Sequence, residues 1–162
     1  MKSKILVSGC LLGQPVRYNG LPLTLESELL CHWSELGLIV PLCPEIAAGF
    51  QAPRPPAEIE QGYDGFDVSI GLGRVFEDNG RDVTVLFQTG AQIALDKAIA
   101  EGCRYALLTD GSPSCGSTFI YSGQHNGKQR PGLGIVASRL KEAGIKVFAQ
   151  NQIQQLADDL LH

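Results

Sequence analysis

The stretch that decides the fold is Lys4-Ile5-Leu6-Val7-Ser8-Gly9-Cys10-Leu11-Leu12-Gly13. Its first half is a short apolar run with the length and composition of a buried β-strand. The two glycines that flank Cys10 and its neighbours permit a tight turn and a close approach of the backbone. We therefore expect a first strand over residues 4–8 that leads into a loop carrying a thiol.

Helical patterns separate this strand from the later ones. Thr24 can cap a helix whose apolar stripe is Leu25, Leu29, Trp33 and Leu36. Further strands are expected over 38–42, 105–109 and 145–148. A second helix is expected over 83–101, a third runs through Leu140 and ends at Gly144, and a last one begins after a cap at Asn151. This alternation predicts a parallel sheet covered on both faces. The expected fold is a single-domain, three-layer, Rossmann-like α/β architecture over residues 1–162.

Two stretches rich in glycine and proline interrupt the alternation. The first covers 44–80, where Pro53, Pro55 and Pro56 oppose a regular helix. Within it, residues 67–77 are expected to form a small strand or hairpin before a tight turn at 78–80. The second is a glycine-rich loop over 111–134. We expect both stretches to form long loops around a site.

Composition limits the partners that we expect. The chain has a net charge of −4 and only 7% aromatic residues, which is unlike a surface that neutralises nucleic-acid phosphates. No apolar run reaches membrane length, and the run after the basic N-terminus is too short for the core of a signal peptide. We therefore expect a cytoplasmic protein that binds neither a nucleic-acid polymer nor a membrane.

Five cysteines stand at positions 10, 31, 43, 103 and 115, and in a reducing cytosol they are not expected to form disulfides. Cys10, Cys43 and Cys115 each follow a predicted strand in a loop. Because the carboxyl ends of parallel strands meet at one edge of the sheet, these thiols are predicted to converge in one crevice and hold a metal centre. The alternative is that they are small buried hydrophobic residues, which is our interpretation of Cys31 and Cys103.

Polar side chains accompany these thiols. Glu45 follows Cys43 by two residues, and Ser112 and Ser114 precede Cys115. All three residues are candidates for the site. The alternative is that Glu45 is a solvated acid in a loop and that the two serines only stabilise turns. The sequence shows three candidate thiolate ligands and no evident fourth ligand. This favours a metal centre with an open coordination position for substrate. His125 is the one histidine that we keep as a candidate fourth ligand.

Six runs of the sequence carry a family resemblance. They are Ser8-Gly9-Cys10-Leu11-Leu12-Gly13, Val16-Arg17-Tyr18-Asn19-Gly20, Cys43-Pro44-Glu45-Ile46, Pro53-Arg54-Pro55-Pro56-Ala57-Glu58-Ile59, Ser112-Pro113-Ser114-Cys115-Gly116 and Gly144-Ile145-Lys146-Val147-Phe148. Together they resemble the DUF523 family, which includes thiouracil desulfurases (desulfidases), over essentially the whole chain. The resemblance implies a [4Fe–4S] cluster held by three cysteines, here Cys10, Cys43 and Cys115, with one open iron. The family often has a basic or polar residue where Thr109-Asp110-Gly111 stands, a departure that bears on the choice of substrate.

The resemblance also implies a reaction. It is the non-redox removal of sulfur from a thiolated pyrimidine, either thiouracil or a nucleotide such as 4-thio-UMP, to give uracil or UMP and hydrogen sulfide. Glu45 is expected to activate water, and Ser112 or Ser114 to orient the ring. Four loop cations are either exposed side chains or ligands of a 5′-phosphate, namely Arg17, Arg54, Lys128 and Arg130.

Two other classes of function stay open on the sequence alone. One is a module whose cluster senses iron or oxygen without turnover, although no DNA-binding segment or appended domain is apparent in the sequence. The other is a zinc hydrolase that acts on an amide-like substrate. An iron–sulfur protein also has the iron–sulfur assembly machinery as an expected partner, whereas the sequence does not indicate an oligomeric state.

Overall fold

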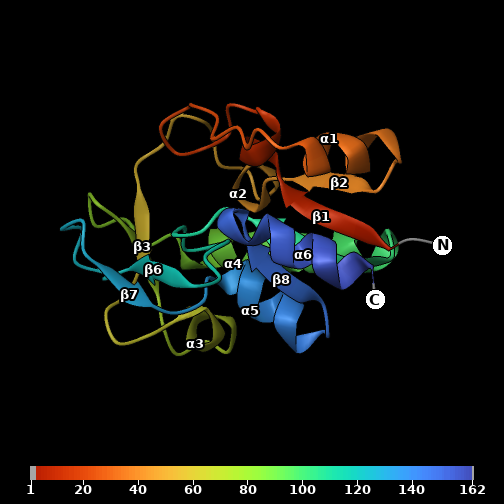
Figure 1. The fold of residues 1–162 in the computed structure, drawn as a ribbon. Coiled ribbons are helices and arrows are strands. Elements are labelled where there is room, and N and C mark those ends of the chain that lie inside the picture. The colour runs from red at the N-terminus through yellow and green to blue at the C-terminus, as the bar shows by residue number, and fades with distance from the viewer. Residues whose placement is uncertain (1–2, 162) are drawn as a thin grey trace.

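The computed structural model describes residues 3–161. Its central sheet has four parallel strands in the order β2-β1-β5-β8 (Figure 1). Their bounds are Lys4–Ser8 for β1, Ile39–Leu42 for β2, Cys103–Leu108 for β5 and Lys146–Ala149 for β8. Strand β1 lies between β2 and β5, so that Leu6 is opposite Val40 on one side and Ala106 on the other. All four strands predicted from the sequence are therefore present.

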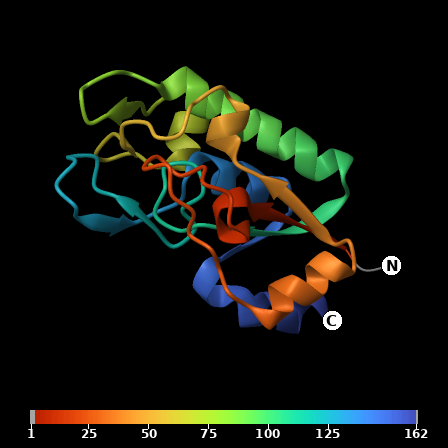
Figure 2. The ribbon, with the colours of Figure 1, turned by 90° about the horizontal axis from the view of Figure 1, so that it is seen from above.

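Helices cover both faces of this sheet (Figure 2). Helices α1 (Glu28–Glu35) and α6 (Ile153–Leu160) pack on one face, where Ile5 and Val7 meet Trp33 and Leu156. Helices α4 (Thr84–Ala100) and α5 (Ile135–Glu142) pack on the other face, against Leu6. Successive side chains of β1 point to opposite faces, as strand geometry requires. The three-layer α/β fold predicted from the sequence is confirmed.

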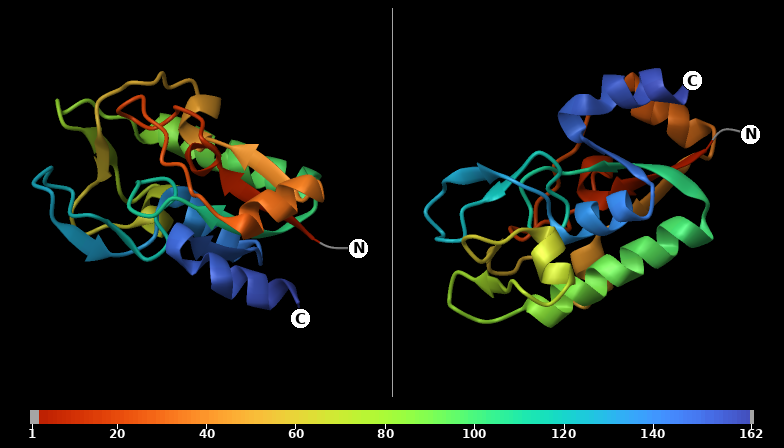
Figure 3. Two further views of the ribbon diagram at one scale, coloured as in Figure 1. Left: turned by 45° about the horizontal axis from the view of Figure 1, so that its top comes forward. Right: turned by 90° about the horizontal axis from the view of Figure 1, so that it is seen from below.

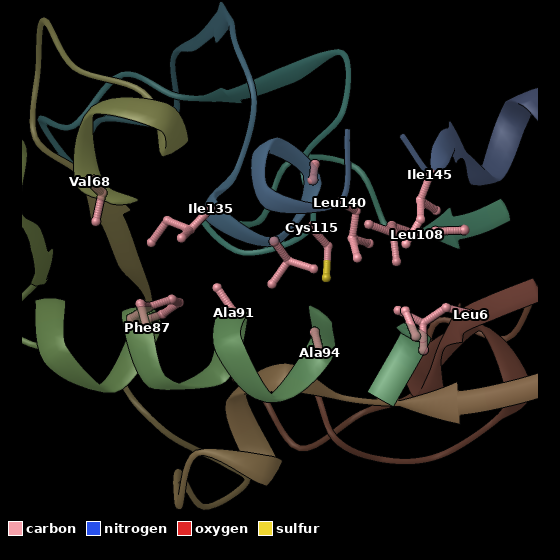
Figure 4. Close-up of a cluster of buried hydrophobic side chains, with 14 of the residues drawn as sticks. Leu6, Val68, Phe87, Ala91, Ala94, Leu108, Cys115, Ile135, Leu140 and Ile145 are labelled. Carbon is pink, nitrogen blue, oxygen red and sulfur yellow. The ribbon is translucent and has the colours of Figure 1, made fainter. Parts of the chain in front are cut away.

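The larger core lies between the sheet and helices α4 and α5 (Figure 4). Small side chains on one face of α4, among them Ala91 and Ala94, are fully buried there. Gly90 brings the short helix α2 (Pro44–Ala47) close to α4, because a Cβ atom at Gly90 would lie 2.6 Å from the Pro44 carbonyl oxygen. This close approach fixes the position of the segment that follows Cys43.

The first helix begins later than predicted. It starts at Glu28 with Ser27 as its N-cap, and not after Thr24. The preceding segment is held in another conformation, because the N–H group of Leu25 donates to the Leu11 carbonyl at 2.9 Å. A tertiary contact with the turn that carries Cys10 therefore replaces the first helical turn.

The two stretches expected to be irregular contain short elements. The first includes α2, α3 (Gly65–Ser69) and the antiparallel strands β3 (Ala57–Ile59) and β4 (Val75–Glu77). The expectation of a strand or hairpin within 67–77 is therefore only partly right, since β4 pairs with a strand that lies earlier in the chain. The second stretch forms a hairpin of β6 (Phe119–Tyr121) and β7 (Gln129–Pro131).

The last helix is also capped differently from the prediction. A 3₁₀ turn, η2 (Gln150–Gln152), includes Asn151, and Gln152 is the N-cap of α6. The side chain of Gln150 instead accepts the N–H group of Asp110 at 2.8 Å, which ties this turn to the loop after β5. Within residues 3–161, no helix combines the length and apolar character needed to cross a membrane.

Candidate metal centre and its cavity

The carboxyl ends of β1, β2 and β5 open onto a cavity of about 450 Å³. The chain runs from β1 to β2 on one side and later to β5 on the other, so the cavity lies where the strand order reverses, a usual ligand position. The short strands β3, β6 and β7 project beyond this edge of the sheet (Figure 3). We call two parts of the lining the thiol floor, made of Ser8, Cys10, Cys43, Thr109 and Cys115, and the rim, made of Arg17, Tyr18, Glu58, Tyr121 and His125.

The three thiols from three separate loops all line this one cavity. A second, more open hollow of about 600 Å³ lies beside the start of α4, where Arg74, Asp82 and Thr84 contribute to its lining. That hollow has no cysteine in its lining. The hollow with the larger volume is therefore not the one lined by Cys10, Cys43 and Cys115.

Cys10 lies in a single 3₁₀ turn, η1 (Gly9–Leu12), directly after β1. The turn ends at Gly13, whose φ of 91° is a left-handed conformation that glycine adopts at little cost. The Cys10 sulfur lies 2.8 Å from the hydroxyl oxygen of Thr109 at the end of β5. Burial raises the pKa of the Cys10 thiol, although the Thr109 hydroxyl and the charge of Arg17 act in the opposite direction.

Cys43 is the N-cap residue of α2 and is only half-buried. Burial raises the pKa of the Cys43 thiol, and the nearby N–H group of Ile46 counteracts this rise without forming a capping hydrogen bond. The Cys43 sulfur lies 3.9 Å from the carbonyl oxygen of Val16. This contact places Cys43 beside the loop that carries Arg17.

Cys115 is buried to the same extent as Cys10, with 6% of each residue exposed. Figure 4 shows its sulfur turned toward helix α4, within the larger core. The hydroxyl of Ser8 donates to this sulfur over 3.7 Å. Burial strongly raises the pKa of the Cys115 thiol, and the negative charge of Glu45 acts in the same direction.

Three thiols with raised pKa values are protonated at neutral pH unless a cation replaces their protons. Cys10 and Cys43 are also close enough to Cys115 to influence its pKa. Within residues 3–161, no three cysteine, histidine, aspartate or glutamate side chains form a group that could hold a single metal ion. An iron–sulfur cluster suits this donor set, because its cysteine ligands bind different iron atoms and need not converge on one point.

Glu45 is anchored by two other residues. Its carboxylate forms an ion pair with the guanidinium of Arg54, and both side chains are largely buried, at 14% and 7% exposed. The hydroxyl of Ser114 donates to the other carboxylate oxygen at 3.4 Å. Arg54 also donates to the Val16 carbonyl at 2.9 Å, so it links Glu45 to the loop at the rim.

The loop after β5 is held by its own polar side chains. The Ser112 hydroxyl oxygen accepts the N–H groups of Ser114 and Cys115 at 3.1 and 2.7 Å, which is turn chemistry. Ser112 lines the cavity, whereas Ser114 does not contribute to the lining. Burial opposes ionisation of Asp110, but hydrogen bonds from Thr118 and neighbouring N–H groups lower its pKa overall.

The four candidate cations have different positions. Arg17 lines the cavity, is half-buried, and has no ion pair within residues 3–161. Arg54 also lines the cavity but is paired with Glu45. Lys128 is exposed, and Arg130 donates to the carbonyl of Glu60 at 3.1 Å. Neither Lys128 nor Arg130 belongs to the cavity lining.

His125 lies at the rim in a left-handed conformation, with φ at 53°. Its Nδ1 atom is 3.4 Å from a carboxylate oxygen of Glu58. The other oxygen of Glu58 accepts the N–H groups of Gly123 and His125 at 2.8 and 3.2 Å. Glu58 therefore organises the tip of the β6–β7 hairpin and orients the imidazole.

The chain is similar in sequence and in structure to known proteins. A model of the 2-thiouracil desulfurase family matches residues 5–152. The chain belongs to the 2-thiouracil desulfurase family. This 2-thiouracil desulfurase family member is 40% identical over 152 residues to the uncharacterized protein YbbK of Bacillus subtilis (strain 168), with 94% of this chain and 99% of YbbK covered.

The fold of this family member also resembles a solved structure, that of the [4Fe-4S]-dependent thiouracil desulfidase TudS. The TM-score is 0.89, the identity is 43%, and 98% of each chain is covered. The DUF523 resemblance inferred from the motifs is confirmed, because TudS also carries the DUF523 designation.

Some features of this family member were missed by sequence reasoning. Ser8 and Thr109 contact two of the thiols, and Glu58 orients His125. The sequence offered one indication of Ser8 and Thr109, which was their place at the ends of two predicted strands. These strands are neighbours in the sheet, which brings the two residues together. Cys103 is buried as predicted, but the interpretation of Cys31 as buried is wrong, because Cys31 is exposed on α1.

Proposed function

We propose that this member of the 2-thiouracil desulfurase family is an iron–sulfur enzyme that removes sulfur from a thiolated pyrimidine. The observation that carries the proposal is one cavity lined by three thiols and by the anchored carboxylate of Glu45. The family match and the likeness to TudS support it, because both cover nearly the whole chain. In the net reaction, water and thiouracil give uracil and hydrogen sulfide, and no electrons are transferred.

Cys10, Cys43 and Cys115 are the residues that we propose hold a [4Fe–4S] cluster with one open iron. Burial of Cys10 and Cys115 and partial burial of Cys43 support this assignment, since a cationic group that replaces their protons offsets the cost of placing thiolates there. When bound, the cluster supplies a soft Lewis acid for the thiocarbonyl sulfur. We assign His125 to the rim, where Glu58 faces its Nδ1 atom.

Glu45 is the residue that we propose accepts a proton from the attacking water and later returns one. Arg54 and Ser114 contact different oxygens of its carboxylate, and these two anchors restrict its orientation. A general base needs such restriction, because proton transfer requires hydrogen-bond distance in a defined direction. We therefore assign Arg54 as a positioning residue for Glu45, and not as a ligand of substrate phosphate.

The cavity suits a pyrimidine nucleotide. Its volume falls in the range of small-molecule sites, and the rings of Tyr18, Phe50 and Tyr121 offer aromatic surface for a flat base. Ser112 is the lining hydroxyl that we propose orients the base. Arg17 is the cation that we propose binds a 5′-phosphate, which makes 4-thio-UMP a better substrate than free thiouracil.

The proposal is tested by anaerobic purification, an absorption spectrum, and iron and sulfide analysis, followed by a sulfide-release assay. The substrates are 2-thiouracil, 4-thiouridine and 4-thio-UMP, and chromatography identifies the desulfurated product. We expect a brown protein that loses its colour and activity in air. A colourless, air-stable protein that contains stoichiometric zinc and remains active would contradict the proposal.

We further propose that residues 1–162 act as one DUF523-like domain in the cytoplasm, supplied with its cluster by the iron–sulfur assembly machinery. Both hydrophobic clusters share the central sheet, which favours a single folding unit. All five cysteines are free, as expected where thiols are kept reduced. Limited proteolysis of the loaded protein tests the first point, since one unit resists cleavage along its whole length.

A further inference from the structure

Two hydroxyl residues lie side by side under the thiols, at the boundary between β1 and β5. Ser8 is the last residue of β1, and Thr109 directly follows β5. The two strands are hydrogen-bonded neighbours in the sheet, so their carboxyl ends are adjacent. Ser8 is 3% exposed and Thr109 is 9% exposed. Buried hydroxyls need hydrogen-bond partners, and these two have a cysteine sulfur each.

The direction of these hydrogen bonds follows from the donors available. The Ser8 hydroxyl oxygen accepts the N–H group of Thr109 at 3.1 Å, which leaves its own hydrogen for the Cys115 sulfur 3.7 Å away. The Thr109 hydroxyl lies 2.8 Å from the Cys10 sulfur, and in the free thiol either atom can donate. A thiolate has no hydrogen, so Thr109 must be the donor once Cys10 binds a metal.

Cys43 lacks a donor of this kind. Its sulfur lies 3.9 Å from the Val16 carbonyl oxygen, which accepts hydrogen bonds and cannot donate one. In the part of the chain that the structure describes, no side-chain hydroxyl donates to it. The three sulfurs are therefore unequal, because two have a hydroxyl donor and the third, which is also less buried, does not.

We propose that Ser8 and Thr109 are positioning residues that fix the Cys115 and Cys10 thiolates and withdraw electron density from their sulfurs. The inference rests on the proposed three-cysteine cluster and not on its activity. Hydrogen bonds to ligand sulfurs raise the reduction potential of a cluster, and outer-shell partners strengthen retention of the metal. Electron-poor sulfurs also leave the open iron a stronger Lewis acid for a soft sulfur substrate.

The test uses anaerobically loaded, substrate-free protein. Thr109→Val removes one hydroxyl with little change in shape, Ser8→Ala removes the other, and Thr109→Ser keeps a hydroxyl at the same place. Ser138→Ala is the matched control, because it removes a buried hydroxyl on α5 that does not line the cavity. The readouts are the reduction potential of the cluster and the rate at which a chelator removes its iron.

We expect Thr109→Val and Ser8→Ala each to move the potential to a more negative value and to lose iron about tenfold faster. Thr109→Ser should restore both quantities, and Ser138→Ala should leave them unchanged. An unchanged potential in both loaded removal variants overturns the inference, as does a Thr109→Ser variant that behaves like Thr109→Val. Because no substrate is needed, a protein that holds a cluster but releases no sulfide would refute the proposed reaction and leave this result intact.

Discussion

The thiol floor and the rim line the same cavity, but they are built in opposite ways. Four floor residues stand at or just after the ends of β1, β2 and β5, and Cys115 lies further along the loop that follows β5. The polar atoms of Ser8, Cys10 and Thr109 contact one another or a neighbouring sulfur. Rim residues come from the loop after η1, from the short strands β3 and β6, and from the tip of the β6–β7 hairpin, and Tyr18 is 43% exposed. The floor is therefore built mainly on the central sheet, whereas the rim is built on shorter elements outside that sheet.

This difference fits two separate functions, metal binding by the floor and substrate selection by the rim. A metal centre needs ligands whose positions are set before binding, and strand ends in a packed sheet provide such positions. Substrate selection needs groups that can vary, and loops tolerate variation because their backbone lies at the surface. Arg54 connects the two parts, since it contacts both Glu45 and the Val16 carbonyl.

The largest expected effect concerns the floor itself. Replacing Cys10, Cys43 or Cys115 by Ala should abolish the cluster and all activity, because only three thiolates are proposed to hold it. Cys31→Ala is the matched control, since Cys31 is exposed on α1. Iron analysis and the absorption spectrum give the measurement. Loss of iron in Cys31→Ala together with retention in Cys43→Ala would show that the centre lies elsewhere.

The next effect concerns proton transfer at the edge of the floor. Glu45→Gln keeps the shape of the side chain but cannot exchange a proton, so turnover should fall by roughly 10² or more. The variant should keep its cluster and still bind substrate, which an absorption change without sulfide release would show. Turnover near the wild-type value would transfer this role to another group, with Ser112 as the first candidate.

Arg54 tests the connection between floor and rim. Arg54→Ala should lower turnover about tenfold or more on thiouracil and on 4-thio-UMP alike, because it acts through the position of Glu45. Arg54→Lys keeps the charge and should recover part of this loss. Separate kcat and KM values on both substrates distinguish a positioning role from phosphate binding. A rise in KM confined to 4-thio-UMP would return Arg54 to the role of phosphate ligand.

A smaller effect is expected at the rim. Arg17→Ala should raise KM for 4-thio-UMP roughly tenfold, the usual result of losing one charge-assisted hydrogen bond. Its kinetics on free thiouracil should hardly change. Lys128→Ala is the control, because Lys128 is a loop cation outside the cavity lining. Equal changes on both substrates in Arg17→Ala would remove Arg17 from phosphate binding.

The smallest effect distinguishes the two cysteines outside the floor. Burial, with the nearby charge of Glu101, raises the pKa of Cys103 to about 11. At pH 8 only about one Cys103 side chain in a thousand is a thiolate, so iodoacetamide should modify exposed Cys31 first. Modification of Cys103 should accelerate as the pH approaches 11, as mass spectrometry of loaded protein can follow. Equally fast modification of both at pH 8 would contradict the assigned burial.

The order of strands and helices could be predicted because their signals are local. Apolar runs of strand length before Cys10 and Cys43, and a long helical stretch before Gly102, depend only on neighbouring residues. The start of α1 was misplaced because its cause is not local. The N–H group of Leu25 donates to the Leu11 carbonyl, and this contact cannot be predicted from the helix propensities of neighbouring residues.

What the sequence by itself determined was the fold class, the family motifs, and which three of five cysteines follow strand ends. These depend on periodicity and position along the chain, which can be read without coordinates. Only the tertiary structure decided that Glu45 is paired with Arg54 and that Arg130 lies outside the cavity lining. It also decided that, among residues 3–161, side-chain hydroxyls reach two of the three sulfurs and not the third. The reason is physical, because a hydrogen bond or ion pair depends on direction and on distances of about 3 Å, and residues many positions apart acquire these only when the sheet packs.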